Sequence, residues 1–215
     1  MRHLAARRAL VAALAELAER GLNIGTSGNA GLRIDDGLLV SPSGVGAEVL
    51  RPGDVVALGA DGAVREGRLG PSSEWRFHRD ILARRPDVDA VVHVHSPHAT
   101  ALACLHRAIP PFHYLVALAG GDDVRVADYA TFGTQALSDN VLAALQGRYA
   151  CLMANHGLLA LGRDLPQAVA LAREVENLSR QYLLALQTGG EPVLLDGEQM
   201  AAVRTKIRTY GPGQG

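Results

Sequence analysis

The sequence predicts a single α/β domain in which a sheet of short strands is covered by helices. Short apolar runs of alternating polarity are mixed with longer segments of helical periodicity, which is the pattern of a layered α/β domain. The chain has 215 residues, enough to bury one sizeable core. No linker, composition change, repeat or low-complexity segment divides it. We therefore expect one domain over residues 1–215.

The N-terminal part is predicted to form a helix followed by two hairpins. Leucine and valine side chains recur at helical spacing over residues 4–20, and Gly21 follows as a helix C-cap. The tripeptide Asp-Asp-Gly at residues 35–37 separates two short apolar runs, which indicates a hairpin. Ala-Asp-Gly at residues 60–62 repeats this signal. The paired strands are expected at residues 30–34 with 38–40 and at residues 55–58 with 63–65.

The rest of the chain alternates helices and strands. A helix over residues 74–84 ends just before Pro86, because proline disfavours helical conformation in the residue that precedes it. Alternation over residues 90–95 predicts a strand, and a loop is expected from about residue 106 to 128. The other expected elements are helices over residues 97–105, 134–145 and 165–187 and strands over residues 150–154 and 158–161.

Charge and composition exclude several classes of function. With 21 basic and 22 acidic residues the net charge is -1, so the chain has no general attraction to nucleic acid or anionic membranes. No apolar run approaches the roughly 20 residues that span a bilayer, and charged residues interrupt the N-terminal stretch. Cys104 and Cys151 form no CxxC pair. We therefore expect a reduced, cytoplasmic protein without nucleic-acid or membrane partners.

Three histidines form a candidate metal site. His93 and His95 are two residues apart on a predicted strand, so both imidazoles project from the same face. His156 lies in a turn between two apolar strands, where a histidine has no evident packing purpose. Three protein ligands and one exchangeable position are typical of catalytic zinc. The alternatives are partly exposed histidines without a ligand and a purely structural zinc site.

Glu74 begins a predicted helix directly after two serines. Its simplest role is to complement the positive end of the helix dipole. Near a metal it could instead be a ligand and a base. His78 lies four residues further on the same helix face, and we interpret it as a packed residue with a satisfied ring nitrogen rather than as a ligand.

Three loops rich in small residues form a candidate phosphate site. Each offers hydroxyls and unobstructed backbone N–H groups, and the third precedes a helix whose dipole also favours an anion. Any one of them alone is more typical of an ordinary turn. The loops are Gly25-Thr26-Ser27-Gly28-Asn29, Ser41-Pro42-Ser43-Gly44 and Pro71-Ser72-Ser73.

In order and spacing, these motifs resemble the class II aldolase/adducin family. The resemblance covers nearly the whole chain and implies a three-layer α/β fold with a central mixed or antiparallel sheet flanked by helices. Segments 113–121 and 129–134 point to the aldolase branch and to ketose 1-phosphates of the L-fuculose 1-phosphate type. The other matching segments are residues 21–29, 41–44, 71–74, 93–97 and 155–157.

The resemblance also implies roles for individual residues. The three histidines would hold one Zn2+ per subunit, with Glu74 as the fourth ligand of the resting site and the catalytic acid/base. Tyr114 would exchange a proton with the aldehyde oxygen, reaching a neighbouring subunit's site in a homotetramer with interfacial active sites. Tyr210 would close over the substrate, and the products would be dihydroxyacetone phosphate and an aldehyde. The implied phosphate ligands are Thr26, Asn29, Ser43, Gly44, Ser72 and Ser73.

Other functions share this scaffold. An L-ribulose 5-phosphate 4-epimerase or a sugar-phosphate dehydratase would retain the metal site and use different acid/base groups, so the fold alone does not define the reaction. A non-catalytic adducin-like interaction module would lose the metal ligands, whereas here they are present. The lone lysine, Lys206, leaves a Schiff-base mechanism almost without a candidate.

Overall fold

In the computed structural model, which describes residues 1–208, eight strands form a single sheet. The strands are β1 (Asn29–Ile34), β2 (Gly37–Val40), β3 (Val56–Gly59), β4 (Val64–Glu66), β5 (Ala90–Val94), β6 (Arg125–Ala127), β7 (Ala150–Met153) and β8 (Gly157–Gly162). The helices are α1 (Leu4–Glu19), α2 (Trp75–Arg84), α3 (Pro97–Cys104), the 3-10 helix η1 (Tyr114–Ala119), α4 (Gln135–Ala144), α5 (Leu165–Gln187) and α6 (Gly197–Arg208).

The sheet is mixed. Its strand order is β4-β3-β2-β1-β5-β8-β7-β6, and the β6–β7 pair is parallel whereas the other neighbours are antiparallel. In the ladder between β1 and β5, Asn29 lies opposite His93. In the next ladder, His93 lies opposite Leu159 of β8. The register therefore sets a histidine of the central strand between residues from two distant parts of the chain.

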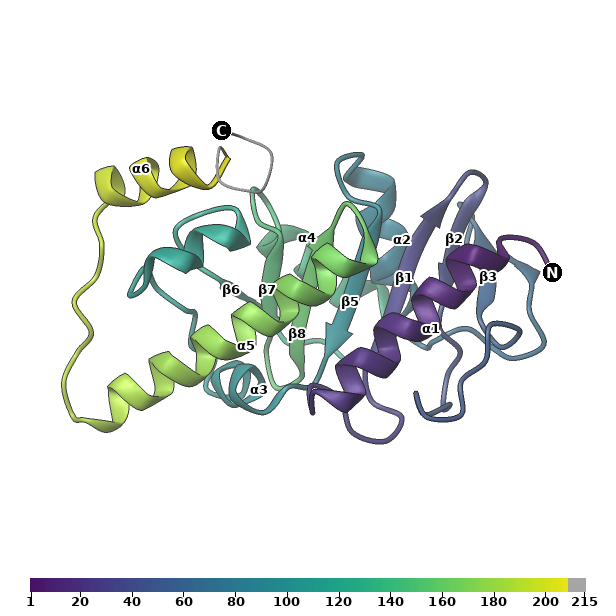
Figure 1. The fold of residues 1–215 in the computed structure, drawn as a ribbon, viewed down its shortest axis with the longest axis horizontal. Coiled ribbons are helices and arrows are strands. Elements are labelled where there is room, and N and C mark those ends of the chain that lie inside the picture. Colours follow the sequence, from purple (N-terminus) through teal and green to yellow (C-terminus); the bar gives the residue numbers. More distant parts are fainter. Residues whose placement is uncertain (209–215) are drawn as a thin grey trace.

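Helices cover both faces of the sheet and make three layers. Figure 1 shows α1 and α5 across one face, with α2 and α4 behind the sheet. Val91 and Val92 are consecutive in β5 and pack into different buried apolar clusters, one on each face, because successive side chains of a strand point to opposite faces. All five residues of β5 are buried, as expected for a strand covered on both sides.

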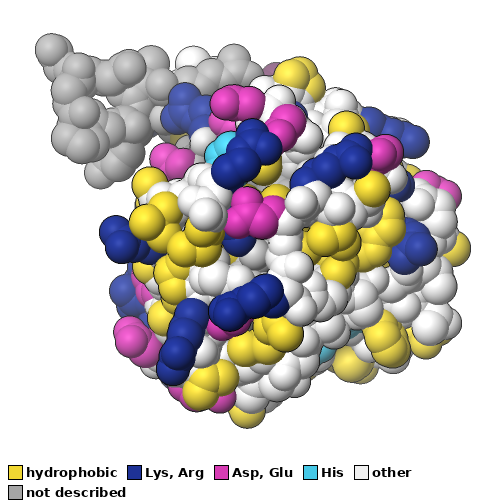
Figure 2. Space-filling model, turned by 90° about the vertical axis from the view of Figure 1, so that its right-hand side faces the viewer, with side chains coloured by type: hydrophobic (Ala, Val, Ile, Leu, Met, Phe, Trp, Pro, Cys, Tyr) yellow, Lys and Arg dark blue, Asp and Glu magenta, His cyan; other side chains and the backbone are white. Residues whose placement is uncertain are grey.

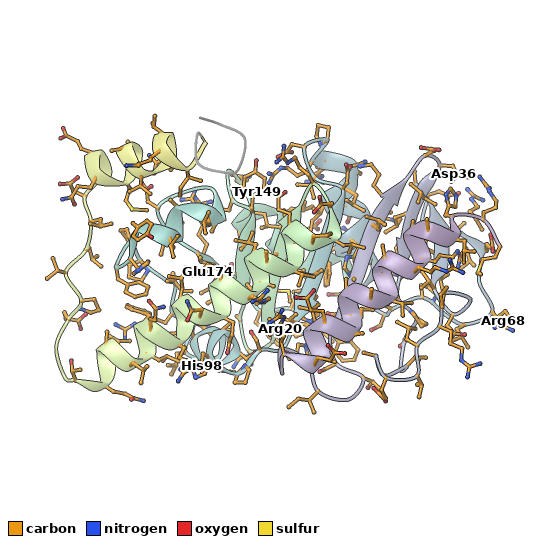
Figure 3. All side chains as sticks on the ribbon, viewed as in Figure 1. Arg20, Asp36, Arg68, His98, Tyr149 and Glu174 are labelled. Carbon is orange, nitrogen blue, oxygen red and sulfur yellow. The ribbon has the colours of Figure 1, made fainter. Side chains whose placement is uncertain are left out.

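The ends of several strands meet at one end of the sheet, along the strand direction. In Figure 3, Asp36, in the turn between β1 and β2, lies at the upper end of the strands. Arg20 and His98 lie at the lower end. At the lower end β1 starts and β5 ends, since the two strands are antiparallel. The turn between β7 and β8 lies there as well, because β8 is antiparallel to β5. The candidate site lies at this end of the strands.

Most of the predicted elements are present, and the expected α/β fold with a mixed central sheet is confirmed. The segment expected to be a loop from about residue 106 to 128 instead contains η1 and β6. Strand β6 has only three residues, too few for a periodic pattern, and exists because it pairs with β7. The helix α6 was also not predicted.

The face seen in Figure 2 carries both basic and acidic side chains. Basic and acidic side chains are interspersed there, without a large area of one sign. Within residues 1–208, none of the helices combines the length and apolarity needed to cross a bilayer.

Candidate metal centre and substrate cavity

The three candidate histidines converge at the end of the sheet where β5 ends. His93 is the fourth residue of β5, His95 follows the strand, and His156 lies in the turn between β7 and β8. Their candidate ligand nitrogens all lie within 4.8 Å of one another. The two Nε2 atoms of His93 and His95 are 2.9 Å apart. The predicted grouping of the three imidazoles is therefore present in the fold.

Burial keeps these imidazoles neutral. It lowers the pKa of His93 to about 3, with a smaller contribution from the adjacent His95. Burial also lowers the pKa of His95, opposed by the Glu74 carboxylate. It lowers the pKa of His156 to about 4, with His93 as the next cause. At neutral pH all three rings are therefore in the form that binds metals.

The turn that carries His156 is shaped by its two neighbours. Asn155 has a left-handed backbone (φ 53°), which asparagine tolerates better than most residues. Gly157 has no room for a side chain, because a Cβ there would lie 2.4 Å from the carbonyl oxygen of Val94, with the rings of His95 and His93 at 3.1 and 3.2 Å. The motif Asn-His-Gly thus lets the turn approach the end of β5.

Glu74 immediately precedes α2 and is buried beside the histidines. Its Oε2 atom lies 3.5 Å from Nε2 of His93, and its Oε1 atom lies 3.4 Å from Nε2 of His156. The backbone N–H of Glu74 donates to the Ser72 hydroxyl. Oε1 is buried and has no hydrogen-bond partner. The predicted placement of Glu74 at a helix start and next to the histidines is observed.

This set of donors fits a divalent transition metal such as zinc. Neutral imidazoles converge with a carboxylate oxygen that has no other partner, and three histidines with one carboxylate are ligand types that zinc prefers. Nδ1 of His93 lies 3.1 Å from the Leu158 carbonyl, so Nδ1–H donates to it and Nε2 is left as the ligand atom.

His78 is a packed residue of α2, as its sequence context suggested. Its ring is fully buried, and burial lowers its pKa to about 3. Nε2 lies 2.6 Å from Oδ1 of Asn29. Asn29 in turn donates from Nδ2 to Oε2 of Glu74 at 2.9 Å. The implied phosphate ligand Asn29 therefore has a buried side chain that also contacts the acid/base candidate.

The three small-residue loops lie together around one cavity. Ser72 N–H donates to the Ser41 carbonyl, and Ser43 N–H donates to the Gly70 carbonyl. The loop after α1 is tied to the metal site by Asn23, whose Oδ1 accepts from the backbone N–H of His95. The implied phosphate ligands all line the cavity, namely Thr26, Asn29, Ser43, Gly44, Ser72 and Ser73.

The cavity has a volume of about 330 Å³, which is in the range of small-ligand sites. Glu74, His95 and His156 form part of its wall next to the phosphate loops. A ligand in it would contact the metal donors and the hydroxyl-bearing loops at once.

Part of the cavity wall was not among the predicted site residues. Tyr129 and Phe132 are exposed and line the cavity beside Ser73, and Asn155 lines it beside His156. Arg76 fixes the loop of the two aromatic residues by donating to the Gly133 carbonyl at 2.7 Å. The segment had pointed to the aldolase branch, but nothing in its spacing showed which side chains reach the cavity.

The remaining two predicted residues lie elsewhere. Tyr114 begins η1, is 51% exposed and stacks on His113, and it is not part of the cavity wall of its own chain. Tyr210 lies outside the described residues. Tyr114 therefore lies apart from the cavity of its own chain.

The fold and the histidine–glutamate cluster define a class of protein, and sequence comparison gives the same class. The chain matches the Class II Aldolase and Adducin N-terminal domain over residues 8–183. It belongs to the class II aldolase/adducin family, and its similarity to aldolases of that family makes it an aldehyde-lyase.

Individual relatives are similar over nearly their whole length. The 5-methylthioribulose-1-phosphate/5-deoxyribulose-1-phosphate aldolase of Rhodospirillum rubrum is 53% identical over 208 residues, which cover 97% of this chain and 93% of the relative. L-fuculose phosphate aldolase of Escherichia coli is 45% identical, with 95% and 94% covered. A solved structure of L-fuculose 1-phosphate aldolase superimposes with a TM-score of 0.92 at 39% identity, covering 95% of this chain and 96% of that one.

Proposed function

We propose that the protein is a zinc-dependent aldolase that cleaves a ketose 1-phosphate reversibly into dihydroxyacetone phosphate and an aldehyde. Family membership defines a class II aldolase that acts on a sugar phosphate. The observation that carries the finer proposal is the single cavity in which the metal donors meet three hydroxyl-bearing loops. A phosphate held by the loops would place the carbons of a short sugar beside the histidines and Glu74.

The loops suit a phosphate for electrostatic reasons. Ser72 and Ser73 precede α2, so a phosphate there would lie near the positive end of the helix dipole. Gly28 and Gly44 have left-handed backbones (φ 75° and 70°), which let the loops turn tightly around a ligand. Among residues 1–208, no lysine or arginine lines the cavity, which leaves hydroxyls, the Asn29 amide and backbone N–H groups as the donors.

Cleavage requires one proton to leave the C4 hydroxyl and one to arrive at C3. When bound by the three histidines, zinc would polarise the substrate carbonyl as a Lewis acid. Glu74 would donate a proton from Oε1 to C3 after the C3–C4 bond breaks, and take it back in the reverse reaction. Oε1 is suited to this task because it has no hydrogen-bond partner, whereas Oε2 accepts from Asn29.

Tyr114 is the proposed acid/base at the C4 oxygen. It accepts the C4 hydroxyl proton as the new aldehyde forms. Its exposure on η1 supports a contribution to a neighbouring subunit's cavity, and we propose a homotetramer with interfacial active sites. Tyr210 is proposed to close over the substrate. We further propose a cytoplasmic location and a domain that includes the whole chain.

The sugar is proposed to have an apolar end distant from the phosphate. Tyr129, Ala130 and Phe132 form an apolar part of the cavity wall. The relative from Rhodospirillum rubrum, more similar than the one from Escherichia coli, carries the name of a 5-methylthio- and 5-deoxyribulose 1-phosphate aldolase. We therefore favour a 5-deoxy or 5-methylthio pentulose 1-phosphate over L-fuculose 1-phosphate.

The experiment is release of dihydroxyacetone phosphate from these three ketose 1-phosphates. Each is assayed with untreated protein, with chelated protein and after zinc is added back. Release that zinc restores is the expected result, with the larger kcat/KM for the pentuloses. If none of the three substrates released dihydroxyacetone phosphate while zinc was still bound, the proposed aldolase activity would be wrong and an epimerase or dehydratase would be favoured. A structural zinc would show metal exchange that substrate does not slow.

A further inference from the structure

A chain of polar contacts runs from α2 through β1 to the proposed acid/base. Nε2 of His78 lies 2.6 Å from Oδ1 of Asn29, and Nδ2 of Asn29 donates to Oε2 of Glu74 at 2.9 Å. All three side chains are buried, with exposed fractions of 0%, 5% and 7%. The chain is thus shielded from the water that would otherwise compete for these hydrogen bonds.

The direction of each hydrogen bond follows from the carboxylate. An ionised Glu74 can only accept, so the group of Asn29 that faces it must be the NH2 group. The Asn29 oxygen therefore faces His78, and an amide oxygen can only accept. Nε2 of His78 must carry the proton, and Nδ1 of the neutral ring must be bare.

The surroundings of Nδ1 agree with that tautomer. Nδ1 is buried and has no hydrogen-bond partner. A bare acceptor without a partner is tolerated better than a buried N–H without one. The ring packs on Gly31, where a Cβ would lie only 2.6 Å from Nδ1. Asn29 and Gly31 are two residues apart on β1, so one strand face presents both the amide and the space for the ring.

We propose that His78 is a positioning residue for the aldolase reaction inferred above. Through Nε2–H it holds the Asn29 amide in the orientation that donates to Oε2 of Glu74. This leaves Oε1 free toward His156 and the cavity. The inference rests on the proposed function for its kinetic consequence, but the hydrogen-bond arrangement stands by itself.

The orientation also matters for the phosphate. The NH2 group is the only part of an asparagine side chain that can donate to an anion. With its oxygen held by His78, Asn29 presents this group on the side of the cavity and of Glu74. Without His78, the Asn29 oxygen would lose its partner, and the amide could turn so that its NH2 group is no longer fixed toward Glu74 and the cavity.

Two variants separate this role from packing. Glutamine has its amide nitrogen the same number of bonds from Cβ as Nε2 of histidine, so His78→Gln keeps the donor. His78→Leu fills a comparable volume and offers no donor. If His78 served only to fill space, the two variants would behave alike.

The expected kinetic result is a difference in kcat. His78→Leu should lower kcat for cleavage and the rate of proton exchange on dihydroxyacetone phosphate by roughly 10- to 100-fold, with zinc content close to wild type. His78→Gln should stay within a few fold of wild type. Equal losses in both variants, or a loss confined to zinc content, would overturn the proposal.

A second measurement does not depend on activity. In metal-free protein labelled with 15N-histidine, the resonance pair missing from the His78→Gln spectrum belongs to His78. We expect a protonated Nε2 and a bare Nδ1 at neutral pH, and a protonated Nδ1 would overturn the proposal whatever the kinetic results. If wild-type protein released no dihydroxyacetone phosphate while the tautomer was as expected, the proposed reaction would fail and the hydrogen-bond arrangement would remain.

Discussion

Nδ1 of His93 on β5 lies 3.1 Å from the carbonyl oxygen of Leu158 on the neighbouring strand β8. The contact sets the tautomer of the imidazole, because a proton on Nδ1 leaves Nε2 bare toward the other two histidines. The carbonyl belongs to the residue next to Gly157, so the turn that presents His156 also orients His93. Metal affinity should therefore depend on the backbone of this turn as well as on the ligands.

The first prediction tests that dependence with Gly157→Ala. The added Cβ would lie 2.4 Å from the Val94 carbonyl oxygen, so strand and turn must move apart. We expect a loss of roughly 1–3 kcal/mol in the free energy of unfolding, measured by urea denaturation of metal-free protein. Zinc affinity, measured by chelator competition, should fall too. Gly197→Ala is the control, since nothing lies within 4 Å of a Cβ there; similar behaviour of the two variants would contradict the argument.

The second prediction concerns Glu74→Gln. The amide cannot move a proton, so proton exchange on dihydroxyacetone phosphate should fall by roughly 10²- to 10⁴-fold. Zinc should stay largely bound, because the three histidines remain. Exchange is followed by NMR in deuterated water and zinc by metal analysis of the same sample. Normal turnover of this variant would remove Glu74 from the mechanism.

The third prediction concerns Tyr114→Phe. The lost hydroxyl should slow cleavage more than it slows proton exchange on dihydroxyacetone phosphate, because only cleavage involves the C4 oxygen. Both rates are measured on one preparation. Equal losses would argue against a role at C4.

The fourth prediction tests whether Tyr114 acts across a subunit boundary, as its place outside its own cavity suggests. Tetramers assembled from equal amounts of Glu74→Gln and Tyr114→Phe subunits would contain sites with both native residues, about a quarter of the total if mixing is random. Unmixed variants serve as controls. No recovery in verified hybrids would place both residues in one chain's site.

The fifth prediction concerns metal-free stability at acid pH. Burial lowers the pKa of His78 from its ordinary value of 6.5 to about 3. Between these pH values the unfolded chain binds a proton at this histidine that the folded protein does not. The contribution of His78 to the free energy of unfolding is therefore fully present above pH 6.5 and decreases as the pH falls. At about pH 5 the loss from His78 alone is roughly 2 kcal/mol.

His78→Gln should therefore reduce the difference in urea denaturation midpoint between about pH 7.5 and pH 5. An unchanged pH dependence in His78→Gln would contradict a buried neutral ring.

Local pattern was enough for much of the fold and of the metal site. The spacing of His93 and His95 defined one strand face, Pro86 limited α2, and Asn-His-Gly marked the turn of His156. Each of these signals acts over a few residues, through strand pleating, proline sterics or turn conformation. Glu74 was recognisable for a similar reason, since it precedes a helix.

Other features had no local signal. Strand β6 is defined by its pairing with β7, and a three-residue strand carries no periodicity. The exposed Phe132 lines the cavity, and Arg76, from a distant part of the chain, donates to the carbonyl of the next residue, Gly133. Tyr114 was expected to reach a neighbouring subunit's site, and the fold places it outside the cavity of its own chain.

The sequence by itself indicated most of the elements, the family and the candidate metal donors, because these depend on spacing along the chain. Only the tertiary structure decided that Asn29 lies opposite His93 and joins His78 to Glu74. That contact depends on the register between β1 and β5 and on the seat of α2 above β1. Both result from packing over the whole sheet and cannot be inferred from any short stretch of the sequence.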